Sequence, residues 1–224
     1  MSNLLLSSRR FCAALAVLAV SALSASAQTF SNPAPITIND ATTATPYPST
    51  ILVAGLTGNI ASMTLTLFGL SHTFPDDIDV LLVGPTGVSL IVMSDTGGLN
   101  SLVGVTYVFA GGSPALSDAG ANPSGTYAPT NFGAATDVFA APAPVGPYGN
   151  GIPGALPNFS GFTGTNGNGL WSLYVVDDLS GDVGSISGGW SMTFSVVPEP
   201  STTALLVLAA GAVGLAAWRK RKTA

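Results

Sequence analysis

The stretch HTFPDDIDVLLVGPTGVSLIVMSDTGG, residues 72–98, has the pattern of a β-hairpin. An apolar run at 78–83 is followed by Gly-Pro-Thr-Gly at 84–87, which is a strong turn signal. The apolar pattern then resumes at 88–93. This order predicts two antiparallel strands that are joined by a tight turn.

Four more segments outside this hairpin have the character of short strands. Polar and apolar residues alternate in 64–67 and again in 190–197, which is the period of a half-buried strand. The segments 102–109 and 171–176 are further candidates. No convincing amphipathic helix occurs between residues 28 and 197, so the sequence predicts an all-β sandwich or barrel.

The segment 110–169 differs from the rest because about a third of its residues are Gly or Pro. A structureless loop of this length is uncommon in a compact domain. The segment therefore contains either short strands or an ordered excursion that wraps the sandwich, and its aromatic residues indicate that parts of it pack down. These residues are Tyr127, Phe132, Phe139, Tyr148, Phe159 and Phe162.

A second informative stretch is FTGTNGNGLWSLYVVDDLSGDVGSISGGWSMTF at 162–194. Together with the hairpin stretch it forms one recognisable pattern of residues along the chain. The residues that carry it are His72, Asp77, Asp79, Pro85, Gly87, Gly169, Trp171, Leu173, Val175, Asp177, Gly184, Trp190, Met192 and Phe194. This order resembles the P domain of proprotein convertases and many bacterial subtilisin-like proteases. The resemblance implies a jelly-roll-like β-sandwich over 28–197, in which His72 belongs to the fold. A protease role is not expected, because no catalytic domain accompanies it.

Charge and residue types exclude several functions for the segment 28–197. It holds ten Asp, no Glu, no Lys or Arg, no Cys and a single His, His72. Nucleic-acid binding is not expected because the basic surface is missing. A Ser-His-Asp triad would need His72 as its base, and no serine lies in a Gly-x-Ser-x-Gly motif. One His without Cys cannot fill a zinc site, so a non-enzymatic protein is expected.

Aspartates gather at two places that suggest a cation site. Asp77 and Asp79 lie at the start of the strand predicted at 78–83, and on one strand they would face the same side. Asp177 and Asp182 follow the strand predicted at 171–176. Calcium takes several hard oxygens in flexible geometry, so these four aspartates are candidate calcium ligands. The alternative is that they cap turns through nearby backbone groups.

Residues 1–27 have the pattern of a secretory signal peptide. Paired arginines precede a short apolar run at 11–23, and Ala25 and Ala27 form an A-x-A cleavage site. The alternative is a membrane-spanning helix. Thirteen residues would rise only about 20 Å, which is less than a hydrocarbon core of about 30 Å.

Residues 198–224 combine three features in a fixed order. An extended motif comes first, an uncharged apolar run at 202–218 follows, and a basic cluster at 219–222 ends the order. The motif is Pro198, Glu199, Pro200 and Ser201. This order resembles the PEP-CTERM sorting signal. The resemblance implies that an exosortase of a Gram-negative bacterium recognises the triplet and removes the transmembrane helix 202–218. The alternative is a plain C-terminal anchor with its basic cluster in the cytoplasm.

Two functions follow from these observations. The first is a non-enzymatic protein that passes through the inner membrane and ends at the cell surface or in an exopolysaccharide matrix. The second is a calcium-assisted module that binds carbohydrate or protein through the aromatic residues of 110–169. Exposed aromatic residues in that segment would favour the second function, and buried ones the first.

Overall fold

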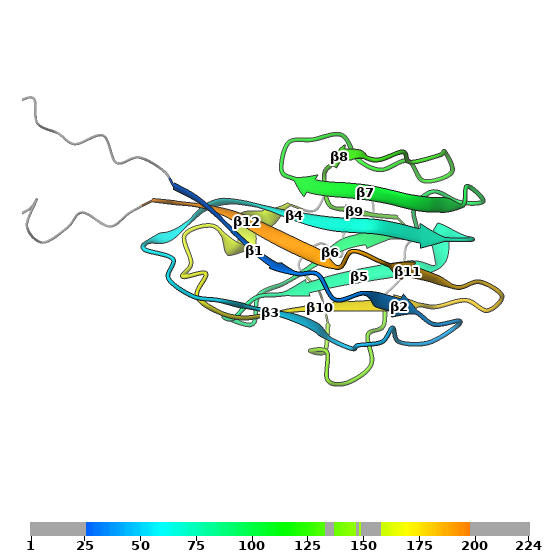
Figure 1. The fold of residues 1–224 in the computed structure, drawn as a ribbon, viewed down its shortest axis with the longest axis horizontal. Helices are drawn as coiled ribbons and strands as arrows, with labels where there is room; N and C mark the ends of the chain where they lie inside the picture. The colour runs from blue at the N-terminus through cyan, green and yellow to red at the C-terminus, as the bar shows by residue number, and fades with distance from the viewer. Residues whose placement is uncertain (1–25, 133–136, 147, 149–157, 198–224) are drawn as a thin grey trace, which may run out of the picture.

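The computed structural model describes residues 26–132, 137–146, 148 and 158–197, and shows two β-sheets packed face to face (Figure 1). The predicted helix 202–218 and most of the predicted signal peptide 1–27 lie outside the described residues. Among the residues that the structure does describe, no helix has the length and apolar character needed to cross a bilayer.

The larger sheet has seven strands. Its order is β1-β12-β4-β11-β2, and β7 and β8 extend it beside β4. The pairs are antiparallel except β7 with β8, which is parallel. The strands are β1 (Ser26–Asn32), β2 (Ile36–Ile38), β4 (Asn59–His72), β7 (Leu102–Ala110), β8 (Gly125–Tyr127), β11 (Gly184–Ile186) and β12 (Trp190–Val197).

The smaller sheet has five strands in the order β3-β10-β5-β6-β9, with a parallel pair only at β6 and β9. Its strands are β3 (Ser49–Val53), β5 (Ile78–Val83), β6 (Ser89–Ser94), β9 (Thr130–Asn131) and β10 (Gly169–Asp177). Two short 3₁₀ helices, η2 (Pro75–Asp77) and η3 (Phe159–Phe162), complete the described secondary structure, which contains no α-helix.

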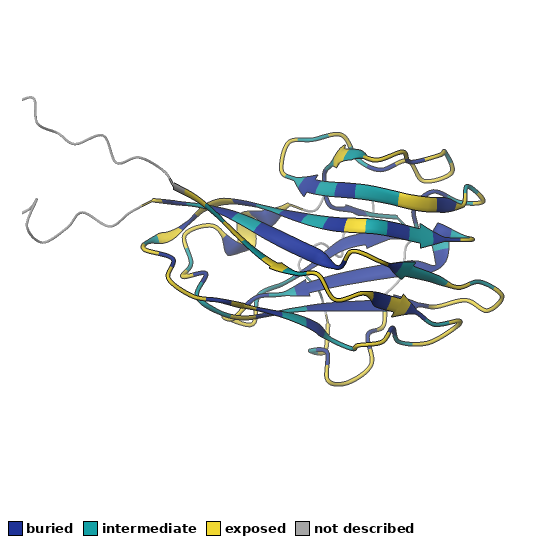
Figure 2. Cartoon of the chain, viewed as in Figure 1, coloured by how far each residue is buried: buried dark blue, intermediate teal, exposed yellow. Residues whose placement is uncertain are grey.

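The core lies between the two sheets, and along β4 buried residues mostly alternate with more exposed ones (Figure 2). Trp171 and Trp190 are fully buried there, and each indole N–H has a partner. The Trp171 Nε1 donates to the carbonyl of Gly167 at 2.8 Å, and the Trp190 Nε1 donates to the Ser49 hydroxyl at 2.9 Å. The core therefore buries large aromatic rings without leaving their polar atoms unpaired.

The predicted hairpin is confirmed as β5 and β6, and the Gly87 N–H donates to the carbonyl of Gly84 within its turn. The strands expected at 64–67, 102–109, 171–176 and 190–197 correspond to β4, β7, β10 and β12. The very short strands were not predicted individually, because two or three residues give too little periodicity.

The segment 137–148 packs against the outer face of the smaller sheet, as far as it is described. There Phe139 and Ala143 join Leu81, Ile91 and Tyr174 in a second apolar cluster. Phe159 and Phe162 of η3 are buried in the main core. The aromatic residues of 110–169 thus serve mainly as packing groups, and the excursion is ordered where the structure describes it.

Candidate metal centre

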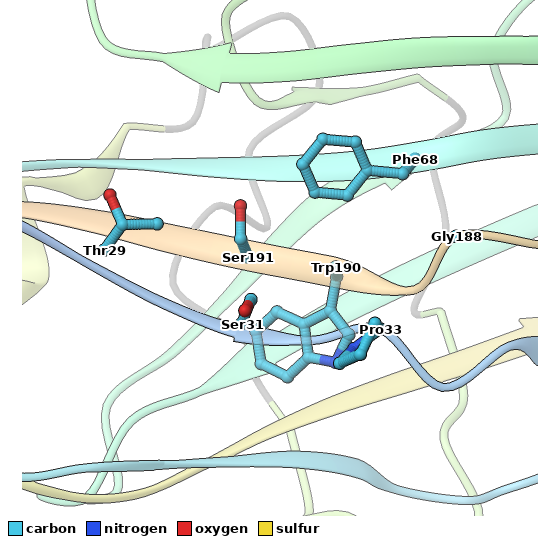
Figure 3. A pocket seen from close by; sticks show the side chains of 7 residues that line it. All are labelled: Thr29, Ser31, Pro33, Phe68, Gly188, Trp190 and Ser191. Carbon is cyan, nitrogen blue, oxygen red and sulfur yellow. The ribbon is translucent and has the colours of Figure 1, made fainter.

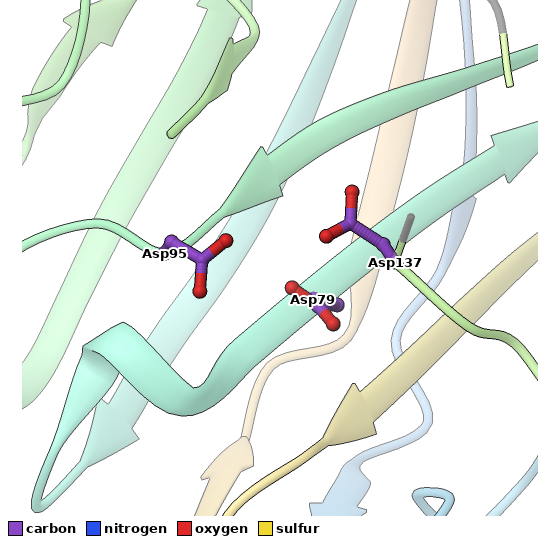
Figure 4. Close-up of side chains that lie close together, drawn as sticks. All are labelled: Asp79, Asp95 and Asp137. Atoms are coloured by element: carbon purple, nitrogen blue, oxygen red, sulfur yellow. The ribbon is translucent and has the colours of Figure 1, made fainter. Parts of the chain in front are cut away.

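Three carboxylates from separate parts of the chain meet at the smaller sheet (Figure 4). Asp79, Asp95 and Asp137 each contribute a carboxylate oxygen, and these oxygens lie within 4.8 Å of one another. Asp79 is buried, with 3% of its surface exposed, whereas Asp95 and Asp137 are partly exposed. The group therefore opens toward solvent on one side.

Strand alternation and a turn bring these carboxylates together. In β5, Val80 and Leu82 face the main core, so Asp79 shares the outer face with Leu81. Asp95 follows the last residue of β6 and has φ of 49°, a left-handed conformation that turns the chain. Asp137 lies two residues before Phe139, whose ring anchors that segment on the sheet.

Neutral side chains supply the hydrogen bonds to this carboxylate group. The Ser94 hydroxyl lies 3.0 Å from Asp95 Oδ2 and 3.2 Å from Asp137 Oδ1. The Asn131 amide donates to Asp137 Oδ2 at 3.1 Å. The part of the chain that the structure describes contains no Lys or Arg, so no basic side chain there can neutralise the three carboxylates.

Burial and mutual repulsion favour the protonated forms of these acids. Burial, together with the nearby charges of Asp137, Asp178 and Asp95, raises the pKa of Asp79 to about 8, against a hydrogen bond from Ser94 that lowers it. Burial likewise raises the pKa of Asp95 to about 6 and raises that of Asp137. A divalent cation would offset the same repulsion, and an all-oxygen set is what a hard cation takes. This group could therefore bind a metal.

The four predicted ligands do not come together as one group. Asp79 belongs to the three-carboxylate group, whereas Asp77 ends the 3₁₀ helix η2 and is not part of β5. The argument that Asp77 and Asp79 face one side of a single strand does not hold, because Pro75 starts a helical turn there. Asp95 and Asp137 were not predicted as ligands.

Asp77 lies instead with the aspartates that follow β10. It is buried, its Oδ1 has no hydrogen-bond partner, and its carbonyl accepts from the Asp178 N–H at 3.1 Å. Burial raises its pKa to about 6, and the charges of Asp177, Asp178 and Asp182 contribute. The negative charges of these carboxylates therefore repel one another.

Asp177 is held by His72 and by backbone groups. The His72 Nε2 lies 3.1 Å from Asp177 Oδ2, and both side chains are fully buried. The His72 Nδ1 lies 2.8 Å from the carbonyl of Phe74. The Phe74 N–H also lies 3.3 Å from Nδ1, so both ring nitrogens of His72 are engaged by polar groups. Asp177 Oδ1 accepts from the N–H groups of Ala41 and Leu179, which is the turn-capping role given above as the alternative.

A shallow hollow also lies on the larger sheet (Figure 3). It has a volume of about 560 Å³ and contains no ionisable side chain. Its lining residues are Thr29, Ser31, Pro33, Phe68, Gly188, Trp190 and Ser191. The lining offers hydroxyl groups and two aromatic side chains, Phe68 and Trp190, and neither an acid nor a base.

Comparison with protein families identifies the C-terminal segment. A family model described as the PEP-CTERM protein-sorting motif matches residues 196–222. This chain carries a PEP-CTERM sorting motif. The motif implies an exported protein that an exosortase processes and sorts to the surface. The match includes the predicted sorting residues 198–201, which lie outside the described residues.

Two solved structures resemble the chain at low identity. One is the serine protease of Aeromonas sobria in complex with a chaperone, with 16% identity and a TM-score of 0.40 over 78% of this chain and 27% of that chain. The other is a crystal structure of the serine protease of Aeromonas sobria, with 17% identity and a TM-score of 0.35 over 76% and 26%. The chain thus spans about a quarter of the protease chains. No curated protein matches it.

Proposed function

We propose that this protein is a non-enzymatic component of the cell surface or exopolysaccharide matrix, delivered by an exosortase. The PEP-CTERM motif at 196–222 is the observation that carries this proposal. In the proposed sequence of events, the signal peptide 1–27 is cleaved after Ala27 and residues 202–218 hold the precursor in the inner membrane. The exosortase then cuts at the triplet and releases a P-domain-like, jelly-roll-like β-sandwich.

Several contacts support the absence of catalysis. His72 is engaged at both ring nitrogens, and Asp177 is engaged at both carboxylate oxygens, so neither is available to a substrate. The hollow beside Phe68 contains no ionisable group. Burial of Phe139, Phe159 and Phe162 favours the matrix protein over the alternative, a module that binds carbohydrate or protein through aromatic residues.

The proposal includes calcium as a structural ion at Asp79, Asp95 and Asp137. The supporting observation is a buried carboxylate whose neighbours are acidic and which no basic side chain of the described residues reaches. A bound ion would join β5, the turn after β6 and the 137–146 segment. It would thereby hold the excursion onto the smaller sheet.

Processing at the triplet is tested with a Glu199→Ala variant expressed in a host that carries the exosortase. Wild-type protein is expected outside the inner membrane, with a mass that lacks residues 202–224. The variant is expected in the inner membrane at its unprocessed mass, because the recognised side chain is missing. Asp118→Ala, which removes an exposed carboxylate of the sandwich, is the matched control and should be processed normally. Wild-type protein that keeps its C-terminus in the inner membrane would contradict the proposal.

A further inference from the structure

All ten aspartates of the chain lie at one end of the sandwich, here called the acidic end. At this end β4 finishes at His72, β5 starts at Ile78, and β10 finishes at Asp177. Loops bring the remaining carboxylates to the same place. Asp40 accepts from the Gly181 N–H, and the residue before Asp118, Ser117, accepts from the Gly97 N–H. The ten are Asp40, Asp76, Asp77, Asp79, Asp95, Asp118, Asp137, Asp177, Asp178 and Asp182.

The opposite end, here called the tail end, is where β1 begins and β12 finishes (Figure 1). Three connections form its surface, and none contains an ionisable side chain. They join β3 to β4, β5 to β6, and η3 to β10, and consist mainly of Gly, Thr and Asn. The three are residues 54–58, 84–88 and 163–168.

Exposed apolar side chains accompany these connections. Leu52 and Leu170 are directly opposite each other on β3 and β10, with 71% and 54% of their surfaces exposed. Val197, the last residue of β12, is 57% exposed. Pro85 of the neighbouring turn packs beside Gly169. As far as the structure describes them, the connections of the tail end therefore contain no ionisable side chain, and leucines lie on their flank.

Chain length places this end near the bilayer. The span proposed above begins at residue 202, so four residues separate it from Val197, the end of β12. Four extended residues reach at most about 14 Å. β4 runs from the tail end to the acidic end in 14 residues, about 45 Å at strand spacing. The carboxylates thus lie several Debye lengths from the lipid headgroups, which matters because many bacterial lipids are anionic.

We propose that the tail end is a bilayer-facing surface of the anchored precursor, with Leu52 and Leu170 against the lipid interface and the carboxylates directed outward. This inference rests on the proposed membrane anchor at 202–218. This orientation keeps all ten aspartates away from anionic headgroups and leaves Glu199 of the triplet as the carboxylate nearest the membrane. It also holds the triplet close to the membrane plane, within reach of a membrane-embedded protease.

Depth measurements on the full chain in lipid vesicles test this surface. In a Cys12→Ser background, Thr86→Cys at the tail end and Ser180→Cys at the acidic end each receive a fluorescent probe. Both positions are exposed. A headgroup-attached quencher is expected to reduce the fluorescence of the Thr86→Cys probe and to leave the Ser180→Cys probe unchanged. Equal quenching at the two positions in membrane-bound protein would overturn the inference while leaving the anchor intact.

A charge substitution distinguishes direct contact of the tail end with lipid from attachment to the membrane through the anchor alone. Leu170→Glu is expected to weaken quenching of the Thr86→Cys probe in vesicles that contain anionic lipid. Leu99→Glu makes the same change at an exposed leucine of the acidic end and is expected to have no effect. Unchanged quenching in Leu170→Glu would overturn the proposed contact. Failure of the chain to partition into vesicles would overturn the anchor itself, and the bilayer-facing surface with it.

Discussion

At the scale of single residues, the only histidine of the chain makes a buried contact with a carboxylate. His72 bridges the end of β4 and the end of β10, because its ring contacts both the Phe74 carbonyl and the Asp177 carboxylate. A buried carboxylate without a cationic partner is costly, since neither water nor another positive side chain reaches it. His72 is therefore a structural residue that permits a carboxylate at this turn.

Replacing His72 by Ala is expected to lower the free energy of unfolding by about 3 to 5 kcal/mol, because Asp177 stays buried without its partner. Chemical denaturation at neutral pH measures the change. Asp118→Asn alters an exposed charge of the acidic end and should change stability by less than about 0.5 kcal/mol. Equal stability of the His72→Ala variant and the wild type would show that the ion pair contributes nothing.

The sequence predicted a structural role for His72. For Asp177 it left two roles open, a calcium ligand or a turn cap. The first assignment came from the resemblance of the motif around His72, and the second from the place of Asp177 after a predicted strand. Asp95 and Asp137 were missed for a different reason: they lie far from Asp79 along the sequence and meet it only after folding. Ser94, which precedes Asp95, is only a weak indication in the sequence that Asp95 belongs to a polar site. The sequence around Asp137 gives no such indication.

At the scale of elements, β11 is held very close to β4. Gly184 begins β11 opposite His72, and a Cβ at this position would collide with the Ser71 carbonyl oxygen and the His72 ring. The short strand can therefore pair with β4 on one side and β2 on the other only because Gly184 has no side chain. This close approach explains why glycine is required at the start of β11.

The Gly184→Ala variant is expected to lose about 1 to 3 kcal/mol of unfolding free energy, because backbone atoms must move apart to admit the methyl group. Thermal denaturation reports the loss. Gly111→Ala is the matched control, since its Cβ would have open space and its φ is not left-handed. A Gly184→Ala variant as stable as Gly111→Ala would mean that β11 can shift at no cost.

Element prediction succeeded where the apolar pattern was long enough. The segment 78–83 coincides with β5 because an uninterrupted apolar run and a Gly-Pro turn define both of its ends. β11 was missed because its three residues have no periodicity of their own, and their pairing partners are distant in sequence. Tertiary contacts, rather than local preference, produce strands of this kind.

At the scale of the whole molecule, stability depends on acids that resist ionisation. Asp79 has a pKa of about 8 and Asp95 one of about 6, whereas the ordinary value is 3.8. The folded state then binds more protons than the unfolded state between about pH 4 and pH 8. The unfolding free energy of the metal-free protein therefore falls as pH rises through this window.

Calcium is expected to restore the unfolding free energy that is lost as pH rises. In the metal-free protein the melting temperature should decrease from pH 5 to pH 8, and added calcium should restore it most strongly at pH 8, where the carboxylates ionise to hold the ion. Asp79→Asn should flatten the pH dependence and abolish the calcium response. Melting curves with calcium or with a chelator, at matched ionic strength, measure both effects. An Asp79→Asn variant that responds to calcium like the wild type would exclude this site.

The arrangement of β1 and β12 sets the order in which the exported chain can fold. β12 lies between β1 and β4, so the larger sheet is interrupted until the last residues of the sandwich arrive. If the chain is exported from its N-terminus, as the proposed signal peptide requires, the N-terminal strands emerge first and wait for their central neighbour. The sandwich would then close only as the sorting motif reaches the membrane, so that folding is completed at nearly the time when the exosortase can act.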